Sequence, residues 1–354
     1  RDLAFDLEAA VHAAREVLRV EPDDLPVLGE LTALERRRSD MAGLAWALEQ
    51  RARVAENAGD KRLAAAALRE LSQVLDQRLG RACESLVALE KCTRLFPDVN
   101  GLLELATLSL RLERPLNARR ALEDVLALLP RHAPPEKLAE VRARLGRACE
   151  QLGDKDAARE NYALAFPLRR LDDDLAAHLE ALYVENRATR ELTDLWAARA
   201  QALLQAGRAH DAAPLFLKAA QTLLEAGDAQ GAILRLTAAL DAAPTGEKAG
   251  DALEAMAKLE LDRGASQEAA RLYGRRALLA SEPREAARWF FRAATLTKDT
   301  PREQPFLAQA LEKDATFIPA RLRRAELIEA TNPREALADF EVVLSAGGEL
   351  QDEQ

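Results

Sequence analysis

Four histidines and one run of aspartates are the residues of this 354-residue chain most suited to metal or acid–base chemistry. Histidine and carboxylate side chains bind metal ions when they recur at spacings such as His-Glu-x-x-His. His12, His132, His178 and His210 lack a partner at any such spacing, so we expect single surface or interface histidines. Asp172-Asp173-Asp174 has the composition of a metal cluster. We interpret it instead as the cap of a helix that begins near residue 173, where negative charge meets the positive end of the helix dipole.

The chain also lacks the usual motifs for nucleotides and nucleophiles. The patterns GxxxxGK[ST], GxGxxG and GxSxG are absent from the sequence. Cys83, Cys92 and Cys149 are too few for a disulfide framework, and their number is odd. Cys83 and Cys92 would lie about 13 Å apart along one helix, too far apart to bridge. We therefore predict no catalytic residue, no cofactor and no metal.

An enzymatic alternative is an (α/α) toroid, a ring of helical hairpins found in carbohydrate-active enzymes. Such sites need stacked aromatic residues and a pair of acids. Trp46, Trp196 and Trp289 are the only tryptophans, and aromatic residues make up 4% of the chain. This composition disfavours the toroid.

The charge balance limits the classes of partner. The formal net charge is −9, whereas proteins that bind nucleic acids or anionic membranes need a clustered positive surface. No apolar run approaches the roughly 18 residues of a membrane span, and no secretory signal is recognisable at the start. We predict no nucleic acid partner, no membrane insertion and a cytoplasmic location.

Self-similarity at a period near 34 residues organises the sequence. If residues 139–172 are numbered 1 to 34, small residues stand at positions 8, 20 and 27 and larger apolar residues at 7, 11 and 24, with a glycine at 15. Small residues let two antiparallel helices approach, and the glycine ends the first of them. These residues are Leu145, Gly146, Cys149, Gly153, Ala158, Tyr162 and Ala165.

The same template fits further segments, which predicts an all-α chain. The segments are 99–132, 213–246, 250–281 and 317–350, with a weaker fit at 173–206. We predict an unpaired helix near 3–20 followed by about nine helix pairs, in a single solenoid over 1–345, and a polar C-terminal tail over 346–354. The pairs are expected near 24–57, 60–95, 99–130, 137–170, 173–206, 209–243, 247–280, 283–313 and 316–345. The stripe of Phe5, Leu7, Val11, Ala14, Val17 and Leu18 is typical of a second helix, so we expect more repeats upstream of Arg1.

The pattern resembles the tetratricopeptide repeat family. The resemblance rests on Leu145-Gly146, Gly153-Asp154, Ala158, Tyr162, Ala165, Gly227-Asp228, Ala232, Ala239 and Pro244. It implies a right-handed α-solenoid that serves as a non-catalytic scaffold for protein–protein interaction. It also implies that positions 2, 5, 9 and 12 of each first helix face a concave groove. The groove residues carried over on this basis are Leu103, Thr107, Leu110, Arg147, Leu217, Gln221, Leu224 and Lys258.

Two further residues are candidates for the partner-binding surface. Arg144 adjoins Arg147 on one first helix, which would suit an acidic partner. Phe290 belongs to the cluster Trp289-Phe290-Phe291 and is either core or a hydrophobic anchor in the groove. Some family members hold a peptide's terminal carboxylate with Lys and Asn, and this chain lacks that pattern, so we do not expect a chaperone-tail adaptor.

The Ala/Leu/Arg-rich composition resembles long repeat scaffolds of high-GC bacteria. It suggests a protein or peptide partner, such as a small Ras-like GTPase or a component of motility, polarity or pilus machinery. The alternatives are a sensor module of a regulator, an assembly factor for an envelope complex and a helical repeat protein that reads RNA. The acidic balance disfavours the RNA reader.

Overall fold

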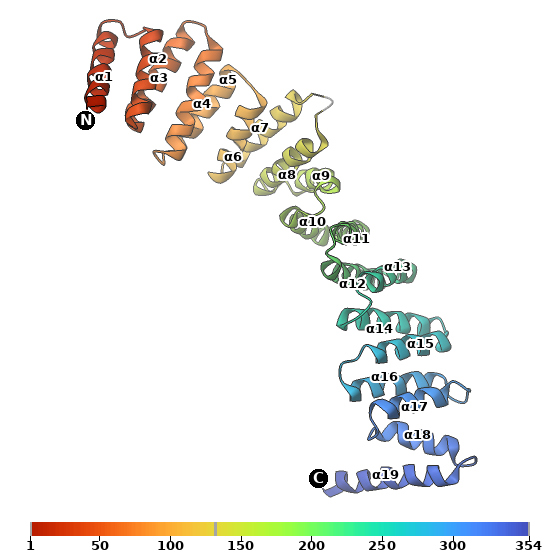
Figure 1. Cartoon of the computed structure of the whole chain (residues 1–354). Helices are drawn as coiled ribbons and strands as arrows, with labels where there is room; N and C mark the ends of the chain where they lie inside the picture. The colour runs from red at the N-terminus through yellow and green to blue at the C-terminus, as the bar shows by residue number, and fades with distance from the viewer. Residues whose placement is uncertain (1, 131–132, 353–354) are drawn as a thin grey trace. The chain divides into compact units, whose positions relative to one another are not determined.

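A computed structural model describes residues 2–130 and 133–352, which form nineteen α-helices and one short 3-10 turn (Figure 1). After α1 (Asp2–Val20), the helices follow one another as nine pairs. The first helices are α2 (Leu25–Arg38), α4 (Lys61–Gln77), α6 (Val99–Arg111), α8 (Pro135–Gln151), α10 (Asp173–Glu185), α12 (Ala209–Glu225), α14 (Glu247–Asp262), α16 (Pro283–Leu296) and α18 (Ile318–Ile328). The second helices are α3 (Met41–Asn57), α5 (Ala82–Leu95), α7 (Pro115–Leu128), α9 (Lys155–Ala165), α11 (Thr189–Gln205), α13 (Ala229–Ala242), α15 (Ser266–Leu278), α17 (Glu303–Lys313) and α19 (Pro333–Asp352). The predicted all-α solenoid of helix pairs is confirmed, and the described residues contain no strand.

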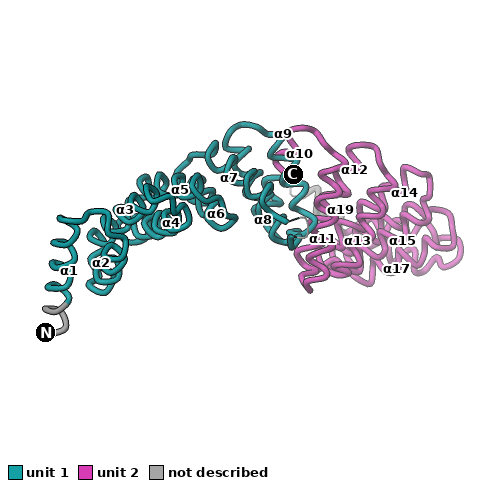
Figure 2. Tube along the Cα trace, turned by 90° about the horizontal axis from the view of Figure 1, so that it is seen from above, with its two compact units in different colours: residues 1–179 teal, residues 180–354 magenta. Residues whose placement is uncertain are grey.

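The helices form two compact units, residues 1–179 and residues 180–354, with the division inside α10 (Figure 2). Within each unit, a helix packs mainly against the helices that precede and follow it in the sequence. This is the contact pattern of a repeat array, in which each element buries its apolar face against its neighbours. A single array over 1–345 stays a prediction.

The last helix is longer than the sequence suggested. It runs to Asp352, through most of the segment 346–354 that we expected as a polar tail. Gly347 and Gly348 lie inside this helix, although glycine is a poor helix former. Neither glycine adopts the left-handed conformation that would turn the chain, so the helix continues.

Aspartate side chains begin several of the helices. Asp154 accepts a hydrogen bond from the backbone N–H of Ala157 at 3.2 Å, and Asp228 accepts one from Gly231 at 2.8 Å. Asp172 accepts from Leu175 at 3.0 Å at the start of α10. Each bond satisfies a backbone donor that has no partner inside the helix. The interpretation of Asp172 as a helix cap is therefore confirmed.

The helices of a pair approach most closely where one of them has no side chain. A Cβ atom on Gly146 of α8 would lie 2.6 Å from Cδ1 of Tyr162 on α9, closer than real Cβ contacts. The Tyr162 ring is buried, as are the small residues Ala158 and Ala165 on the same helix. The aromatic ring thus fills the space that the glycine leaves, which explains the sequence pattern of small and large positions.

The C-terminal pair encloses a carboxylate. Asp339 of α19 is 1% exposed. It accepts two hydrogen bonds from Arg324, both at 2.7 Å, and a third from Arg321 at 2.7 Å. Burial alone would raise the pKa of Asp339, but the two guanidinium groups outweigh burial and hold that pKa below its ordinary value.

Gly146→Ala should lower the free energy of unfolding by roughly 1–3 kcal/mol, because the new methyl group overpacks the contact with Tyr162. Gly29→Ala is a matched control in α2, where the nearest side-chain atoms would lie 3.9 Å from the added Cβ. It should be neutral or stabilise by about 0.5–1 kcal/mol through helix propensity. Urea denaturation followed by circular dichroism measures both, and equal effects would contradict this account of the contact.

Asp339→Asn should weaken the α18–α19 pair at neutral pH by roughly 1–3 kcal/mol, because two half-buried guanidinium groups lose their anionic partner. The folded pKa of Asp339 lies below the unfolded value. The stabilisation is therefore complete above the unfolded pKa of about 3.9 and disappears as the pH falls through the folded pKa. Hydrogen exchange of the α18 and α19 amides at pH 7 and below pH 4 measures the difference between the two proteins. A difference that does not shrink at acid pH would show that the ion pairs are not its cause.

Candidate functional site

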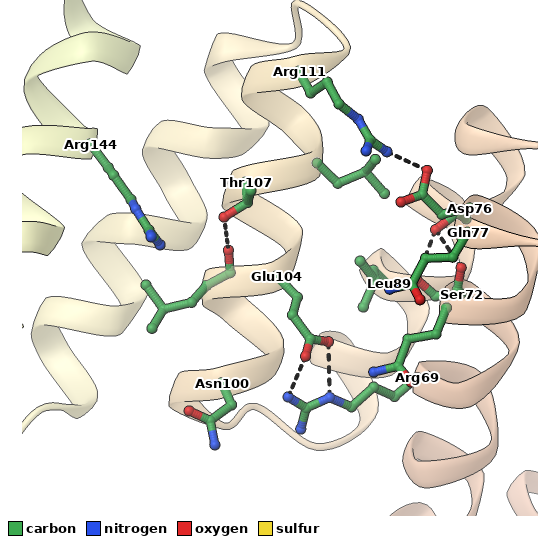
Figure 3. Close-up of a pocket in the computed structure, with 14 residues that line it drawn as sticks. Arg69, Ser72, Asp76, Gln77, Leu89, Asn100, Glu104, Thr107, Arg111 and Arg144 are labelled. Carbon is green, nitrogen blue, oxygen red and sulfur yellow. Dashed lines mark hydrogen bonds and ion pairs between the residues drawn. The ribbon is translucent and has the colours of Figure 1, made fainter. Parts of the chain in front are cut away.

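The first helices of unit 1 border a hollow of about 460 Å³ (Figure 3). Its lining comes from α4, α6 and α8, with two residues of α5 at its base. Leu103, Thr107 and Arg144, three of the predicted partner-binding residues, lie in this lining. We call the accessible side of the first helices in a unit its first-helix face.

The pattern of α6 explains why Leu103 and Thr107 lie on this face. Leu102, Leu105 and Ala106 are buried against neighbouring helices. Residues 103 and 107 lie one turn apart on the remaining side of the helix, so they stay accessible. The hydroxyl of Thr107 donates to the carbonyl oxygen of Leu103 at 2.8 Å, which leaves mainly its methyl group and the Leu103 side chain for a partner.

Ion pairs across neighbouring repeats neutralise this part of the face. Arg69 of α4 donates two hydrogen bonds to Glu104 of α6, at 2.9 and 2.7 Å. Arg111 of α6 pairs with Asp76 of α4, as the dashed lines in Figure 3 show. The hydrogen bonds with Glu104 raise the pKa of Arg69 above its ordinary value. We did not predict these residues, although each pair is separated by 35 residues, about one repeat.

A second, smaller hollow of about 230 Å³ lies between α8, α9 and α10. Arg144 and Arg147 both line it. Arg144 pairs with Glu140 at 2.6 Å, whereas Arg147 forms no ion pair with any residue that the structure describes. Arg147 is exposed and therefore has its guanidinium available to a partner.

Tyr162 and His178 of the same lining belong to a hydrogen-bonded group that the sequence did not reveal. The carboxylate of Glu150 accepts from the Tyr162 hydroxyl at 2.9 Å and lies 2.9 Å from Nδ1 of His178. The Tyr162 and His178 rings stack at 5.6 Å. Burial, followed by the hydrogen bond to Glu150, raises the pKa of Tyr162, so its hydroxyl stays protonated and donates. Cys149 is buried and its pKa is raised by that burial, so no activated nucleophile adjoins the group.

Unit 2 has an equivalent face. Leu217, Gln221 and Leu224 of α12 line a hollow of about 440 Å³. Leu224 and Lys258 line an adjoining hollow of about 650 Å³. Lys258 pairs with Glu254 on its own helix at 2.7 Å. In unit 1, Leu110 is half-buried and lies outside the lining of the hollow.

Phe290 does not lie on this face, so its prediction as a groove anchor is wrong. Its side chain is 2% exposed and packs in a cluster with Ala294, Leu307 and Ala310. Residue 290 lies on the side of α16 that faces α17, where the small residues of α16 are buried. Among its neighbours, Trp289 and Phe291 are half-buried.

The remaining candidates supply no cluster for chemistry. Among the described residues, no group of three or more His, Cys, Asp and Glu side chains could hold a metal ion. His12 and His210 are exposed, and His132 lies outside the described residues. Over the described part of the chain, no helix is long and apolar enough to cross a membrane.

Comparisons with known proteins agree with the repeat pattern. Residues 139–169 match the family model of the tetratricopeptide repeat. A search of curated protein sequences finds no match. Similar solved structures include MamA, with 14% identity and a TM-score of 0.40 over 52% of this chain and 94% of that one. Another is a tetratricopeptide repeat protein of Parabacteroides merdae, with 14% identity and a TM-score of 0.37 over 76% of this chain and 98% of that one. A third is YrrB, described as having an unusual peptide-binding site, with 16% identity and a TM-score of 0.35 over 54% and 91%.

The resemblance to the tetratricopeptide repeat rests on the matched residues and on the helix pairs that reuse their positions. Ala118, Ala158, Ala232 and Ala269 are all buried at the same template position of their second helices. Residues 139–169 form one tetratricopeptide repeat within a series of similar helix pairs.

Proposed function

We propose that this protein is a non-catalytic scaffold that binds a partner protein or peptide on its first-helix faces. One observation carries the proposal: leucine side chains stay accessible on helices whose other sides are buried. Leu103 lines the hollow of unit 1, and Leu217 and Leu224 line the hollows of unit 2. Each lies beside polar or charged groups, so the face offers apolar anchors together with hydrogen-bonding partners.

Such a surface suits a peptide or an exposed helix. Apolar side chains of a bound segment would fill the hollows, and polar groups would fix its register. The leucines contribute to binding because their contact area leaves water only when a partner is present. Thr107 and Gln221, which lie next to them, are small or flexible enough to adapt to a segment's backbone.

The alternative of an RNA reader has less support. A protein that reads RNA one base per repeat needs a similar contact at one position of every repeat. Here the corresponding positions of α6, α8 and α12 hold Leu103, Ala143 and Leu217, with no recurring base-reading or basic side chain.

The alternative of a carbohydrate-active toroid is also disfavoured. Its tryptophans would need to lie together beside a pair of acids. Trp46 is exposed on α3, Trp196 is buried on α11 and Trp289 is half-buried on α16. They belong to three different helix pairs.

A more specific role stays a prediction from composition. The suggested partners are a small Ras-like GTPase or a component of motility, polarity or pilus machinery. The other suggested roles are a sensor and an assembly factor, and the suggested location is the cytoplasm of a bacterium. The first-helix faces described above distinguish none of these.

A photo-crosslinking amino acid at Leu103 or Leu224 should capture a partner protein from a lysate of the source organism. The matched control positions are Leu128 on α7 and Leu234 on α13, which are 45% and 62% exposed on second helices. Mass spectrometry would identify the product. Leu103→Glu and Leu224→Glu should then weaken binding of that partner by at least about tenfold, or 1.4 kcal/mol, without unfolding the chain.

The proposal fails if the control positions crosslink to the same partner as strongly as the two leucines do. It also fails if neither leucine yields a product. Turnover of a substrate by the purified chain would contradict the non-catalytic part of the proposal separately.

A further inference from the structure

Three arginines form a row along α16 of unit 2. Arg284, Arg288 and Arg292 are spaced four residues apart, and all three are exposed. The opposite side of the helix is buried through Ala287, Phe290 and other residues. Arginines at this spacing lie on one side of a helix, about 6 Å apart along its axis. We call them the α16 arginine row.

The row lies on the first-helix face. The buried residues of α16 and α12 share one spacing, so Arg288 directly follows buried Ala287 as Pro214 directly follows buried Ala213. Arg292 lies four residues further along, as Lys218 does on α12, and Pro214 and Lys218 both line the hollow of about 440 Å³. Two of the three arginines therefore hold the positions that line the hollows of the same unit.

Among the described residues, no carboxylate lies within ion-pair distance of the row, although Arg284 contributes, after the hydrogen bond from Thr316, to the lowered pKa of Asp314. None of the three arginines forms an ion pair with any residue that the structure describes, in contrast to Arg69 and Arg111 on the face of unit 1. The nearest acid in sequence, Glu285, accepts a hydrogen bond from Arg276 at 2.9 Å and another from the Trp289 indole at 3.2 Å. Its carboxylate is thus already occupied.

Aromatic rings hold the third arginine in place. The Arg292 guanidinium lies 4.7 Å from the centre of the Tyr273 ring and 5.7 Å from that of Trp289. Those two rings stack on each other at 5.5 Å. A guanidinium held over an aromatic face keeps its N–H edge free for a carboxylate and loses less freedom on binding. Trp, Tyr and Arg are also the residues most enriched at interface hot spots.

The neighbouring first helices limit what can bind. The exposed side of α14 carries Asp251, the exposed side of α18 carries Glu326, and Glu329 directly follows the end of α18. Glu254 of α14 is neutralised by Lys258, and Glu326 lies 3.1 Å from Arg323. A long polyanion such as RNA would meet these carboxylates on both sides of the row. A short acidic segment placed along α16 would not.

We propose that the α16 arginine row binds an acidic segment of a partner protein, in which Asp or Glu recurs at alternate residues of an extended chain. Alternate residues of an extended chain lie about 6.6 Å apart, close to the spacing of the arginines. Each guanidinium can donate two parallel hydrogen bonds to one carboxylate. The inference rests on the proposed function and names the chemistry of one of its ligands.

The probe is a fluorescein-labelled, C-terminally amidated peptide of twelve residues with alternating Glu and Ser, titrated with the full chain at low and high salt. Fluorescence anisotropy should show binding that weakens as salt rises. R288E/R292E should weaken it at least tenfold. R62E/R78E is the charge-matched control, since Arg62 and Arg78 of unit 1 are exposed and form no ion pair with the described residues. It should bind as the unchanged chain does.

Arg288→Glu alone provides a variant that leaves the stack of Arg292 on Tyr273 intact, and it should weaken binding several-fold without lowering the melting temperature. Equal binding by R288E/R292E and the control would overturn the inference. So would equal binding of a Gln-for-Glu peptide, or tighter binding of a single-stranded oligonucleotide than of the acidic peptide. If the crosslinks from Leu103 and Leu224 persist while the acidic peptide does not bind, the proposed function stands and this inference fails.

Discussion

The close approach of paired helices is the constraint on which the other features depend. Second helices meet first helices at an alanine that is fully buried, as Ala118, Ala158 and Ala232 show. A larger residue would separate the helices and remove contacts from both neighbouring repeats, because interiors are close-packed. Helix α17 lacks this alanine. In α17 this position holds Glu303, which is also buried, but its carboxylate accepts hydrogen bonds from Arg323 at 2.6 Å and from the backbone N–H of Asp299 at 2.7 Å. A polar group replaces the alanine only with its hydrogen bonds satisfied.

Once the helices are packed at a fixed period, side chains one period apart come within reach of each other. Arg36 pairs with Glu70, Arg69 with Glu104 and Arg119 with Asp154, at separations of 34 or 35 residues. All lie in unit 1 and are at least partly exposed. Each pair contributes little stability because water and salt screen it. Its larger effect is on the surface, since an arginine paired within the chain is less available to a partner.

The sequence predicted the helix pairs well, because small, large and turn positions recur and each recurrence has a packing reason. It predicted the turns less well. Gly153 and Gly227 adopt the left-handed conformation that ends a first helix, but so do Glu113 and Arg187, which no search for glycine would find. The repeat pattern indicated which positions of a first helix belong to the first-helix face. Leu103 and Leu217 stand at one such position, and each lines a hollow. The group of Tyr162, Glu150 and His178 was not predictable, since it depends on how three helices meet. Phe290 was misplaced because the phase of an apolar helix is ambiguous when two of its sides are buried.

The availability of the α16 arginine row has its origin in another helix. A Cβ atom on Gly250 of α14 would lie 2.6 Å from Nε of Arg276. The absence of that atom lets the Arg276 guanidinium pass between the helices, where it lies 5.2 Å from the centre of the Trp289 ring and bonds Glu285. Glu285 is the acid that could otherwise pair with Arg288, three residues further along the same helix. One missing side chain thus lets Arg276 occupy Glu285 and leaves Arg288 without that partner. Local packing, rather than the repeat pattern itself, gives this helix pair its own binding chemistry.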